Sequence, residues 1–339
     1  MEHQNQHDKQ FPELFAGKTV MYVHGFGSSG QSGTVSRIRQ ALPRATVIAP
    51  DLPIHPQEAM DLLLQTCQEK RPDLIVGTSM GGMYTEMLYG YDRILINPAF
   101  GIADTMGKHG LTGKQLFFSP RQDGVQEFYV DKTLVKEYRT VSEGNFARAT
   151  EPDEQHRVFA LFGDKDNLVH TRSVFDSHYQ QGIPFHGEHR MNDHSFMHSV
   201  VPVMRWIDDR QEGRERPIVY IGTETLMQND GQPRSSMQKT VRQIVEHYQV
   251  YFVAFETTAA ANATVKNLLT EYIGVPAWGH TVFTNQRHLL YGDYLIQGTS
   301  PMRWEGKEAD PMATPIELGS DTFKSWDDIA DYFSRLGGQ

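Results

Sequence analysis

Cysteine is almost absent from this sequence: Cys67 is the single example, so a disulfide within the chain is excluded. So little cysteine is typical of proteins from reducing compartments, and we expect a cytoplasmic location. Residues 1–10 are polar and rich in His and Gln, without the apolar core of a signal peptide. Cys67 lies in a stretch with a helical pattern, 56–69, and we interpret it as a small core residue, not a nucleophile.

Long hydrophobic runs and an excess of positive charge are also absent. No segment approaches the roughly 18 apolar residues of a membrane-spanning helix. The formal net charge is -10 and the pI is about 5.8, so neither nucleic acid nor a membrane is an expected partner. The 339 residues, 39% hydrophobic and 22% charged, predict a soluble globular protein with one large or two ordinary domains.

The most informative stretch runs from residue 74 to residue 88. Its apolar start, 74–76, predicts a short buried strand, and Gly-Thr-Ser-Met-Gly at 77–81 predicts a tight turn into a helix. Ser79 would stand at the tip of this turn as a nucleophile, close to the positive end of the helix. The Met80 N–H is the expected first donor to an oxyanion. An ordinary serine in a glycine-rich turn is the alternative.

A second glycine-rich loop, His-Gly-Phe-Gly-Ser-Ser at 24–29, follows an expected strand at 19–23. Glycines after a strand let the backbone bend and present N–H groups. We therefore expect the Phe26 N–H to be the second oxyanion donor, with Gly25 and Gly27 as substrate-binding positions. The alternative, a phosphate-binding loop, would need the Lys-Ser/Thr of a Walker motif or a Gly-x-Gly-x-x-Gly pattern, and neither is present here.

Strand and helix patterns alternate through the first half of the chain and predict an α/β fold, with a parallel sheet covered by helices on both faces. The expected strands are 19–23, 45–49, 74–76, 93–96 and 158–162, and the expected helices are 33–42, 56–70, 83–88 and 200–207. Residues 99–154 interrupt this alternation, with one helical piece near 132–139. We expect this insertion to cover the site as a lid, with an ordinary surface excursion as the alternative.

A carboxylate after the strand at 158–162 is the expected orienting residue of a Ser-His-acid triad. Asp166 is preferred because hydrolases commonly show Gly-x-x-Asp-x-x-Val there, and the run from Gly163 to Val169 fits. Asp164 is expected to be a turn residue.

The expected base is His194, which lies in the loop before the helix at 200–207. His186, His189 and His198 are its competitors, and the chain has 15 histidines, so context decides the choice. With Ser79 first and Asp166 second, His194 completes the Ser…Asp…His order of α/β-hydrolases.

Residues of about 18–210 resemble the small α/β-hydrolases of the YqiA-type esterase family. The matching pieces occur in order at 22–29, 47–53, 77–82, 97–99 and 193–196. The resemblance implies a serine esterase or thioesterase that acts on small acyl esters, with Ser79, Asp166 and His194 as its triad. It implies no metal and no organic cofactor. An amidase or acyltransferase with the same triad, or a binding protein on an inactive hydrolase frame, is the alternative.

A charged stretch at 211–217 reads as a linker, so the expected domains are 1–210 and 218–339. Expected strands at 218–221, 250–255, 281–283 and 294–296, with helices at 236–247, 261–272 and 326–335, predict a second α/β unit. The pieces 284–296 and 325–329 make this unit similar to the haloacid-dehalogenase-like fold, in particular its deoxyribonucleotidase branch. A small unrelated α/β unit is the alternative.

Active members of that branch open with Asp-x-Asp after the first strand, and the resemblance places Ile221 and Thr223 at those two positions. The motif lysine is replaced by Arg287, and the acidic pair after the late strand becomes Gln297-Gly298. Asp293 is retained from the motif, but the resemblance gives it no ionised partner at the expected places. Thr257 and Thr258 are candidates for anion binding. The resemblance thus implies a non-catalytic domain, which packs beside the hydrolase or makes a homo-oligomer.

Overall fold

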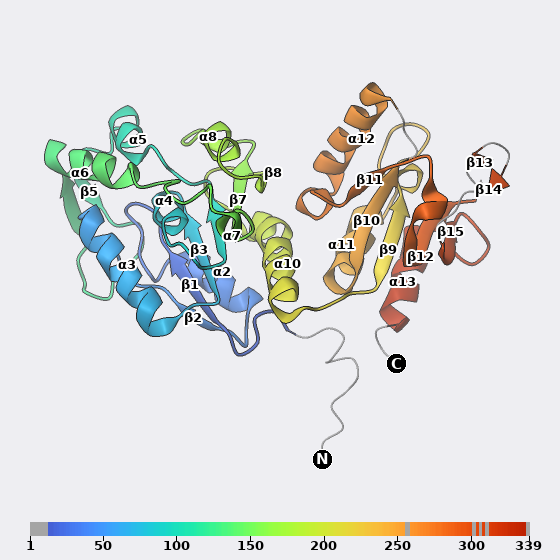
Figure 1. The fold of residues 1–339 in the computed structure, drawn as a ribbon, viewed down its shortest axis with the longest axis horizontal. Helices are drawn as coiled ribbons and strands as arrows, with labels where there is room; N and C mark the ends of the chain where they lie inside the picture. The colour runs from blue at the N-terminus through green and yellow to red at the C-terminus, as the bar shows by residue number, and fades with distance from the viewer. Residues whose placement is uncertain (1–12, 255–257, 300–302, 305–306, 309–311, 337–339) are drawn as a thin grey trace, which may run out of the picture. The chain divides into compact units, whose positions relative to one another are not determined.

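The structure, a computed structural model, describes residues 13–254, 258–299, 303–304, 307–308 and 312–336 (Figure 1). They form two units, one of residues 13–208 and one that begins at Asp209. The division falls within helix α10 (Val201–Glu212), so the first two residues of the expected linker are helical. Among the described helices, none has the length and apolar character needed to cross a membrane.

The first unit is built on a parallel sheet. Within residues 13–208 its six strands have the order β2-β1-β3-β4-β7-β8, and every neighbouring pair is parallel. The strands are β1 (Thr19–Val23), β2 (Thr46–Ile48), β3 (Leu74–Thr78), β4 (Arg93–Ile96), β7 (Val158–Gly163) and β8 (Gly182–Phe185). The central strands β3 and β4 are almost wholly buried, as expected for a parallel sheet covered on both faces. The predicted α/β class is therefore confirmed.

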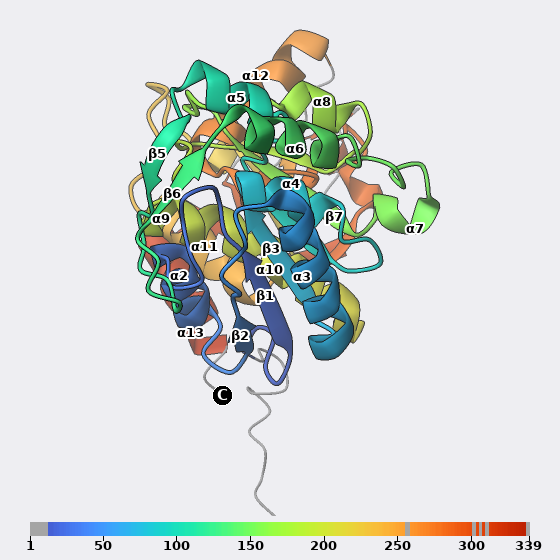
Figure 2. The same ribbon diagram turned by 90° about the vertical axis from the view of Figure 1, so that its left-hand side faces the viewer.

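Helices cover both faces of this sheet. Views at right angles place α3 (Pro56–Lys70) on one face and α10 on the other (Figures 1 and 2). Along α3 the buried residues Ala59, Leu63 and Cys67 recur every four positions and pack into the same core as Met21 of β1. Burial raises the pKa of the Cys67 thiol to about 11, which fits a core residue and not a nucleophile.

The remaining helices of the first unit are α2 (Gly33–Ala41), α4 (Met80–Glu86), α8 (Arg172–Asp176) and α9 (Asp193–Ser195), and a π-helical turn (Phe196–Val200) precedes α10. The 99–154 insertion has its own structure. It contains α5 (Ile102–Lys108), an antiparallel hairpin of β5 (Gly113–Leu116) and β6 (Glu127–Val130), α6 (Lys132–Ser142) and α7 (Pro152–Gln155). Helix α6 begins after Asp131, whose side chain accepts from the Leu134 N–H at 2.8 Å.

A buried polar network ties the end of the insertion to the core. The Glu86 carboxylate is fully buried and accepts from the Asn145 side chain at 3.0 Å and from the Tyr179 hydroxyl at 2.7 Å. Arg93, also fully buried, pairs with Glu154 of the insertion and donates to the Glu86 carbonyl. Buried charges are tolerated when they are paired in this way, so the network fixes where the insertion ends.

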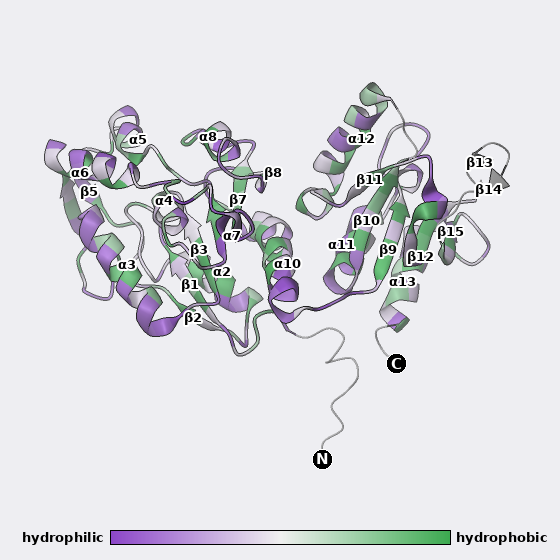
Figure 3. Cartoon of the chain, in the orientation of Figure 1, coloured by the Kyte–Doolittle hydropathy of each residue, from purple (hydrophilic) through white to green (hydrophobic). Residues whose placement is uncertain are grey.

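The second unit is built on a separate parallel sheet, whose order in the described residues is β11-β10-β9-β12-β15. Its strands are β9 (Ile218–Gly222), β10 (Gln249–Ala254), β11 (Thr281–Phe283), β12 (Tyr291–Gly298) and β15 (Met312–Leu318). Its helices are α11 (Met237–His247), α12 (Ala259–Tyr272) and α13 (Trp326–Leu336), with 3-10 turns at Thr223–Thr225, Val275–Ala277 and Arg287–Leu289 and a short β13 (Arg303–Trp304)–β14 (Lys307–Glu308) pair. Strands of both sheets are mostly apolar (Figure 3).

The order of this sheet reverses between β9 and β12, as in doubly wound folds, whose ligands bind outside the carboxyl ends of the strands. Ile221 is fully buried within β9, so its side chain belongs to the core. Asp293 lies at the opposite end of the sheet, where its carboxylate accepts from the Ile218 N–H at 2.7 Å. Thr258 caps α12 by accepting from the Ala261 N–H, and Thr257 lies outside the described residues. The haloacid-dehalogenase likeness stays a prediction.

Candidate active site

The turn around Ser79 is a sharp strand-to-helix connection between β3 and α4. Ser79 has φ 55° and ψ -119°, a backbone conformation that non-glycine residues rarely adopt and that is associated with functional sites. A Cβ at Gly81 would lie 2.0 Å from the Val23 carbonyl oxygen, and one at Gly77 would lie 2.2 Å from the Thr85 hydroxyl. Glycine is therefore required on both sides of the serine for the helix to approach the sheet.

The Ser79 hydroxyl lies at one end of a short hydrogen-bonded chain. His189 Nε2 is 3.0 Å from Ser79 Oγ, and His189 Nδ1 is 2.7 Å from Asp166 Oδ2. Because a carboxylate only accepts, Nδ1 carries the proton and Nε2 is left to accept from the serine hydroxyl. The three side chains thus stand in a continuous hydrogen-bonded chain, which is the arrangement that a Ser-His-acid triad requires.

The prediction that His194 is the base is wrong in this geometry. His194 lies in α9, is exposed, and has its ring against His198 with centroids 4.3 Å apart. The histidine bonded to Ser79 comes instead from the loop after β8, a strand that the sequence pattern did not reveal. In the sequence analysis His189 is only a competitor of His194. Its position shortly after β8, the last strand of the sheet, is the feature that identifies it.

Asp166 is held as a carboxylate. Its side chain is 2% exposed, and burial alone would raise its pKa. The hydrogen bond from His189, together with the Leu168 and Val169 N–H groups at 2.8 and 3.0 Å, outweighs burial and lowers the pKa. Asp164, the rejected candidate, pairs with the exposed His186 at 2.8 Å and takes no part in this chain of bonds.

Asn97, at the end of β4, connects the two loops that carry His189 and Asp166. Its side chain is buried and donates to the carbonyl oxygens of Glu188 and His189, both at 3.1 Å, and its Oδ1 accepts from the Gly163 N–H at 2.8 Å. Asn97 also has φ 45°, a left-handed conformation that Asn tolerates better than most residues. The sequence offered Asn97 only as part of a family-like piece and gave it no role.

The loop after β1 runs beside the nucleophile. A Cβ at Gly25 would lie 3.4 Å from the Ser79 Cβ, so glycine permits this close approach. His24, which is buried, fixes the loop: its Nε2 accepts from the Leu52 N–H at 3.0 Å and its Nδ1 lies 2.9 Å from the Gly25 carbonyl. Burial lowers the pKa of His24, so the ring is neutral and both bonds are retained.

The positions of Phe26 and Met80 allow them to serve as donors. Phe26 lines the cavity that contains Ser79, and Met80 is the first residue of α4, so its N–H has no acceptor within the helix. Gly27 has φ 68°, which disfavours other residues, and a Cβ there would make a tight contact of 3.0 Å with the Phe118 ring. The roles of Phe26, Met80, Gly25 and Gly27 remain predictions.

Ser79 and His189 open into a cavity of about 600 Å³. One part of its wall is apolar and comes from the insertion and from the loop after β7: Ile102, Leu111, Phe118, Leu168 and Val169. Another part is polar and comes from the start of α2: Ser32, Gly33, Thr34 and Arg37. The insertion therefore forms part of the wall of the cavity in this structure. Within the described residues, no group of three or more His, Cys, Asp or Glu side chains is arranged to hold a metal ion.

The model of the uncharacterised protein family UPF0227 matches residues 19–199, more than half of the chain. The chain belongs to this family. The matched segment contains Ser79, Asp166 and His189 and every strand of the first sheet. The resemblance that the sequence predicted for residues of about 18–210 is thereby confirmed at the level of the family.

Several solved structures are similar to this UPF0227 member. Est1E from Butyrivibrio proteoclasticus shares 16% identity at a TM-score of 0.37, with 61% of this chain and 90% of that chain covered. The esterase domain of a Rhodothermus marinus protein shares 15% identity at a TM-score of 0.36, with 60% of this chain and 90% of that chain covered. The α/β hydrolase GrgF from Penicillium sp. sh18 shares 10% identity at a TM-score of 0.39, with 57% of this chain and 89% of that chain covered. Likeness this distant leaves activity and substrate to be argued from the chain's own residues.

Proposed function

We propose that the protein is a serine hydrolase, a carboxylesterase or thioesterase, whose triad is Ser79, His189 and Asp166. The observation that supports this proposal is the continuous chain of bonds at 3.0 and 2.7 Å that joins the three side chains. The strained φ of 55° at Ser79 supports it as well, because such strain is typical of a nucleophile elbow.

The reaction follows from this geometry. His189 Nε2 takes the hydroxyl proton as Ser79 Oγ attacks the acyl carbon, and Asp166 stabilises the imidazolium that forms. The N–H groups of Phe26 and Met80 donate to the oxyanion. Collapse of this intermediate breaks the bond to the alcohol or thiol, which leaves with the proton from His189. Water, deprotonated by His189, then attacks the acyl-enzyme and releases the carboxylic acid.

Single and double variants test the triad through hydrolysis of 4-nitrophenyl butyrate. Ser79→Ala and His189→Ala should each lose at least about 10³-fold in kcat, and the double variant little more, because triad residues act as a unit. His194→Ala is the matched control and should keep wild-type kcat. A fluorophosphonate probe should label Ser79 in the wild type and in His194→Ala. Activity that survives in Ser79→Ala, or that is lost in His194→Ala alone, would refute the assignment.

For the second unit we propose a non-catalytic role. Phosphoryl transfer of the haloacid-dehalogenase type needs an attacking carboxylate, and by the predicted alignment Ile221 and Thr223 replace both aspartates. The full-length Ser79→Ala variant, incubated with nucleoside monophosphates and magnesium, should release no phosphate. Turnover that chelation abolishes would show that a competent site exists and that the alignment is wrong.

A further inference from the structure

The active-site cavity is positively charged in an acidic protein. The chain has 42 Asp and Glu against 32 Lys and Arg, yet the cavity wall includes Arg37 and Arg190 and no acidic residue. Its apolar part lowers the local dielectric, so these charges act on a bound ligand more strongly than they would in water.

Arg190 keeps its charge available. Its guanidinium lies over the Phe118 ring, 4.7 Å from the centroid, and within the described residues it forms no ion pair with a carboxylate. An aromatic face attracts a cation without neutralising it. Arg190 lines the same cavity as Ser79 and His189, so a group that it binds shares this cavity with the reacting atoms.

The Arg37 guanidinium lies near the N-terminal end of α2, where a positive charge destabilises the helix. A Cβ at Gly33, the first residue of α2, would lie 3.8 Å from Arg37 Nη1, so the guanidinium reaches back to the helix start. Cations are unfavourable at a helix N-terminus, and the first turn of α2 contains no acidic residue. One carboxylate, that of Asp193, pairs with Arg37 Nε at 2.5 Å and is itself 83% exposed.

The N-cap of the same helix leaves a hydroxyl unused. Ser32 is 7% exposed, makes no side-chain bond to its helix, and its Oγ has no hydrogen-bond partner within the described residues. The Tyr22 hydroxyl bonds to Thr78 Oγ1 at 2.7 Å. Burial raises the pKa of Tyr22, and the nearby Ser32 and Thr34 hydroxyls also interact with it and lower that pKa. A buried hydroxyl without a partner is costly, and together with the free N–H groups of the first helical turn it forms a set of donors without an acceptor.

We infer that the start of α2 is an anion-binding subsite of the active-site cavity, and that the substrate is an ester with a carboxylate or phosphate group. Ser32 Oγ, the Gly33 and Thr34 N–H groups and Arg37 would hold the anion, with Arg190 as the second cation. Helix N-termini bind both kinds of anion, and arginine forms bidentate bonds with either. The inference rests on the proposed hydrolase for its ester, but the anion subsite does not depend on the chemistry.

Matched substrates measure the preference for charge. The mono-4-nitrophenyl esters of succinate, glutarate and adipate are each compared with the corresponding methyl ester, and 4-acetoxyphenyl phosphate is compared with 4-nitrophenyl acetate. The charge selectivity is the ratio of kcat/KM for the charged and the neutral substrate. Dividing the wild-type selectivity by that of each variant removes the intrinsic reactivity of the substrates.

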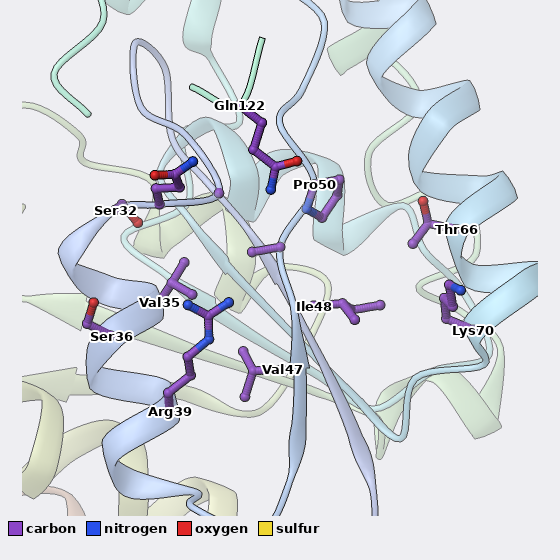
Figure 4. A pocket seen from close by; sticks show the side chains of 13 residues that line it. Ser32, Val35, Ser36, Arg39, Val47, Ile48, Pro50, Thr66, Lys70 and Gln122 are labelled. Carbon is purple, nitrogen blue, oxygen red and sulfur yellow. The ribbon is translucent and has the colours of Figure 1, made fainter. Parts of the chain in front are cut away.

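Arg37→Gln and Arg190→Gln should each lower this selectivity about three- to tenfold, and Ser32→Ala about two- to threefold. Asp193→Asn should raise it, because it frees Arg37 from its carboxylate. Arg39→Gln is the matched control: Arg39 is on the same helix but lines another cavity, of about 690 Å³ over β2, which shares Ser32 with the active-site cavity and contains neither Arg37 nor Arg190 in its wall (Figure 4). Selectivity for the carboxylates alone, or for the phosphate alone, would identify the anion.

A second measurement keeps the subsite separate from catalysis. Inorganic phosphate titrated into Ser79→Ala should bind by calorimetry, and binding should weaken in the Ser79→Ala/Arg37→Gln protein but not in Ser79→Ala/Arg39→Gln. Wild-type protein without ester hydrolysis would refute the proposed function and leave this binding test in place. Equal charge selectivity in Arg37→Gln, Ser32→Ala and Arg39→Gln, or phosphate binding that Arg37→Gln does not weaken, would overturn the subsite.

Discussion

Replacing Asn97 should disable the site without removing any group that touches substrate. The perturbation of choice is Asn97→Gly, because glycine accepts the φ of 45° without strain while it removes all bonds of the side chain. Two of those bonds fix the His189 loop and one fixes the strand end that leads to Asp166. The variant therefore loosens the base and its orienting acid together.

The magnitude follows from the bonds. Three partly buried hydrogen bonds at about 1 kcal/mol each predict a loss of up to about 3 kcal/mol in the free energy of unfolding. A displacement of His189 by about 1 Å predicts a loss of about 10²-fold in kcat, with little change in KM. The measurements are kcat and KM for 4-nitrophenyl butyrate, urea denaturation, and the rate of fluorophosphonate labelling, which should fall in parallel with kcat.

Two further variants make the result specific. Asn97→Asp keeps an acceptor for the Gly163 N–H. Its second carboxylate oxygen, however, would lie against the carbonyl oxygens of Glu188 and His189, which it repels. A loss of kcat similar to that of Asn97→Gly would therefore assign the effect to the His189 loop. Leu63→Ala, in the core of α3, should cost about 2–5 kcal/mol of stability and leave kcat unchanged. Wild-type kcat in Asn97→Gly, together with a stability loss like that of Leu63→Ala, would refute a positioning role.

Two other predictions concern stability. Because burial lowers the pKa of His24, its stabilising effect should be complete above pH 6.5, the ordinary value, and be lost as pH falls below it, where the unfolded chain takes up the proton. Melting temperatures measured against pH should show a shallower decline for His24→Gln, and equal slopes would contradict this. Arg93→Met should cost about 3–5 kcal/mol in urea denaturation, because it leaves the buried Glu154 uncompensated. Arg148→Met, at an exposed pair, should cost much less stability than Arg93→Met, and similar losses for the two would mean that burial is unimportant here.

Most of the predicted strands occur, and 281–283, at an edge of the second sheet, has its predicted bounds. The strands at 19–23 and 93–96 occur with the predicted bounds, since apolar runs that end at Gly, Asn or Pro are buried on both faces and bounded sharply. The strand–turn–helix at Ser79 and the choice of Asp166 over Asp164 came from local patterns that the structure keeps.

The sequence pattern missed the two small antiparallel pairs, β5–β6 and β13–β14, and one strand in each parallel sheet. The two strands missed from the parallel sheets share one reason. β8 and β15 are edge strands of their sheets and contain Pro184 and Pro315. Proline argues against a central strand but is tolerated at an edge, where one side of the strand needs no ladder bonds. Without β8, no pattern in the sequence marks His189 as the histidine that follows a strand, and the position of His194 in the loop before the helix at 200–207 favours His194 as the base. A role for Asn97 was out of reach, since its bonds join residues 66 to 92 positions away.

The loop after β1, which carries Phe26, continues into the start of α2, and hydrogen bonds join the same loop to the insertion. The chain passes from His24 through the loop directly into the start of α2, so a shift of one displaces the other. The insertion is bonded to this same segment: the Phe118 N–H donates to the Gly27 carbonyl at 2.7 Å, and Ser29 Oγ donates to the Pro120 carbonyl at 2.7 Å.

Asp51 strengthens the connection, because one of its carboxylate oxygens accepts from the Gly30 N–H and the other from the Gln122 N–H, both at 2.7 Å. An insertion that opened at this edge as a lid would have to break these bonds and release the loop that carries Phe26. By the proposed mechanism, in which the Phe26 N–H donates to the oxyanion, opening at this edge would disturb oxyanion stabilisation. Substrate must enter where the insertion is not bonded to the loop, or else the loop becomes competent only when the insertion closes on it.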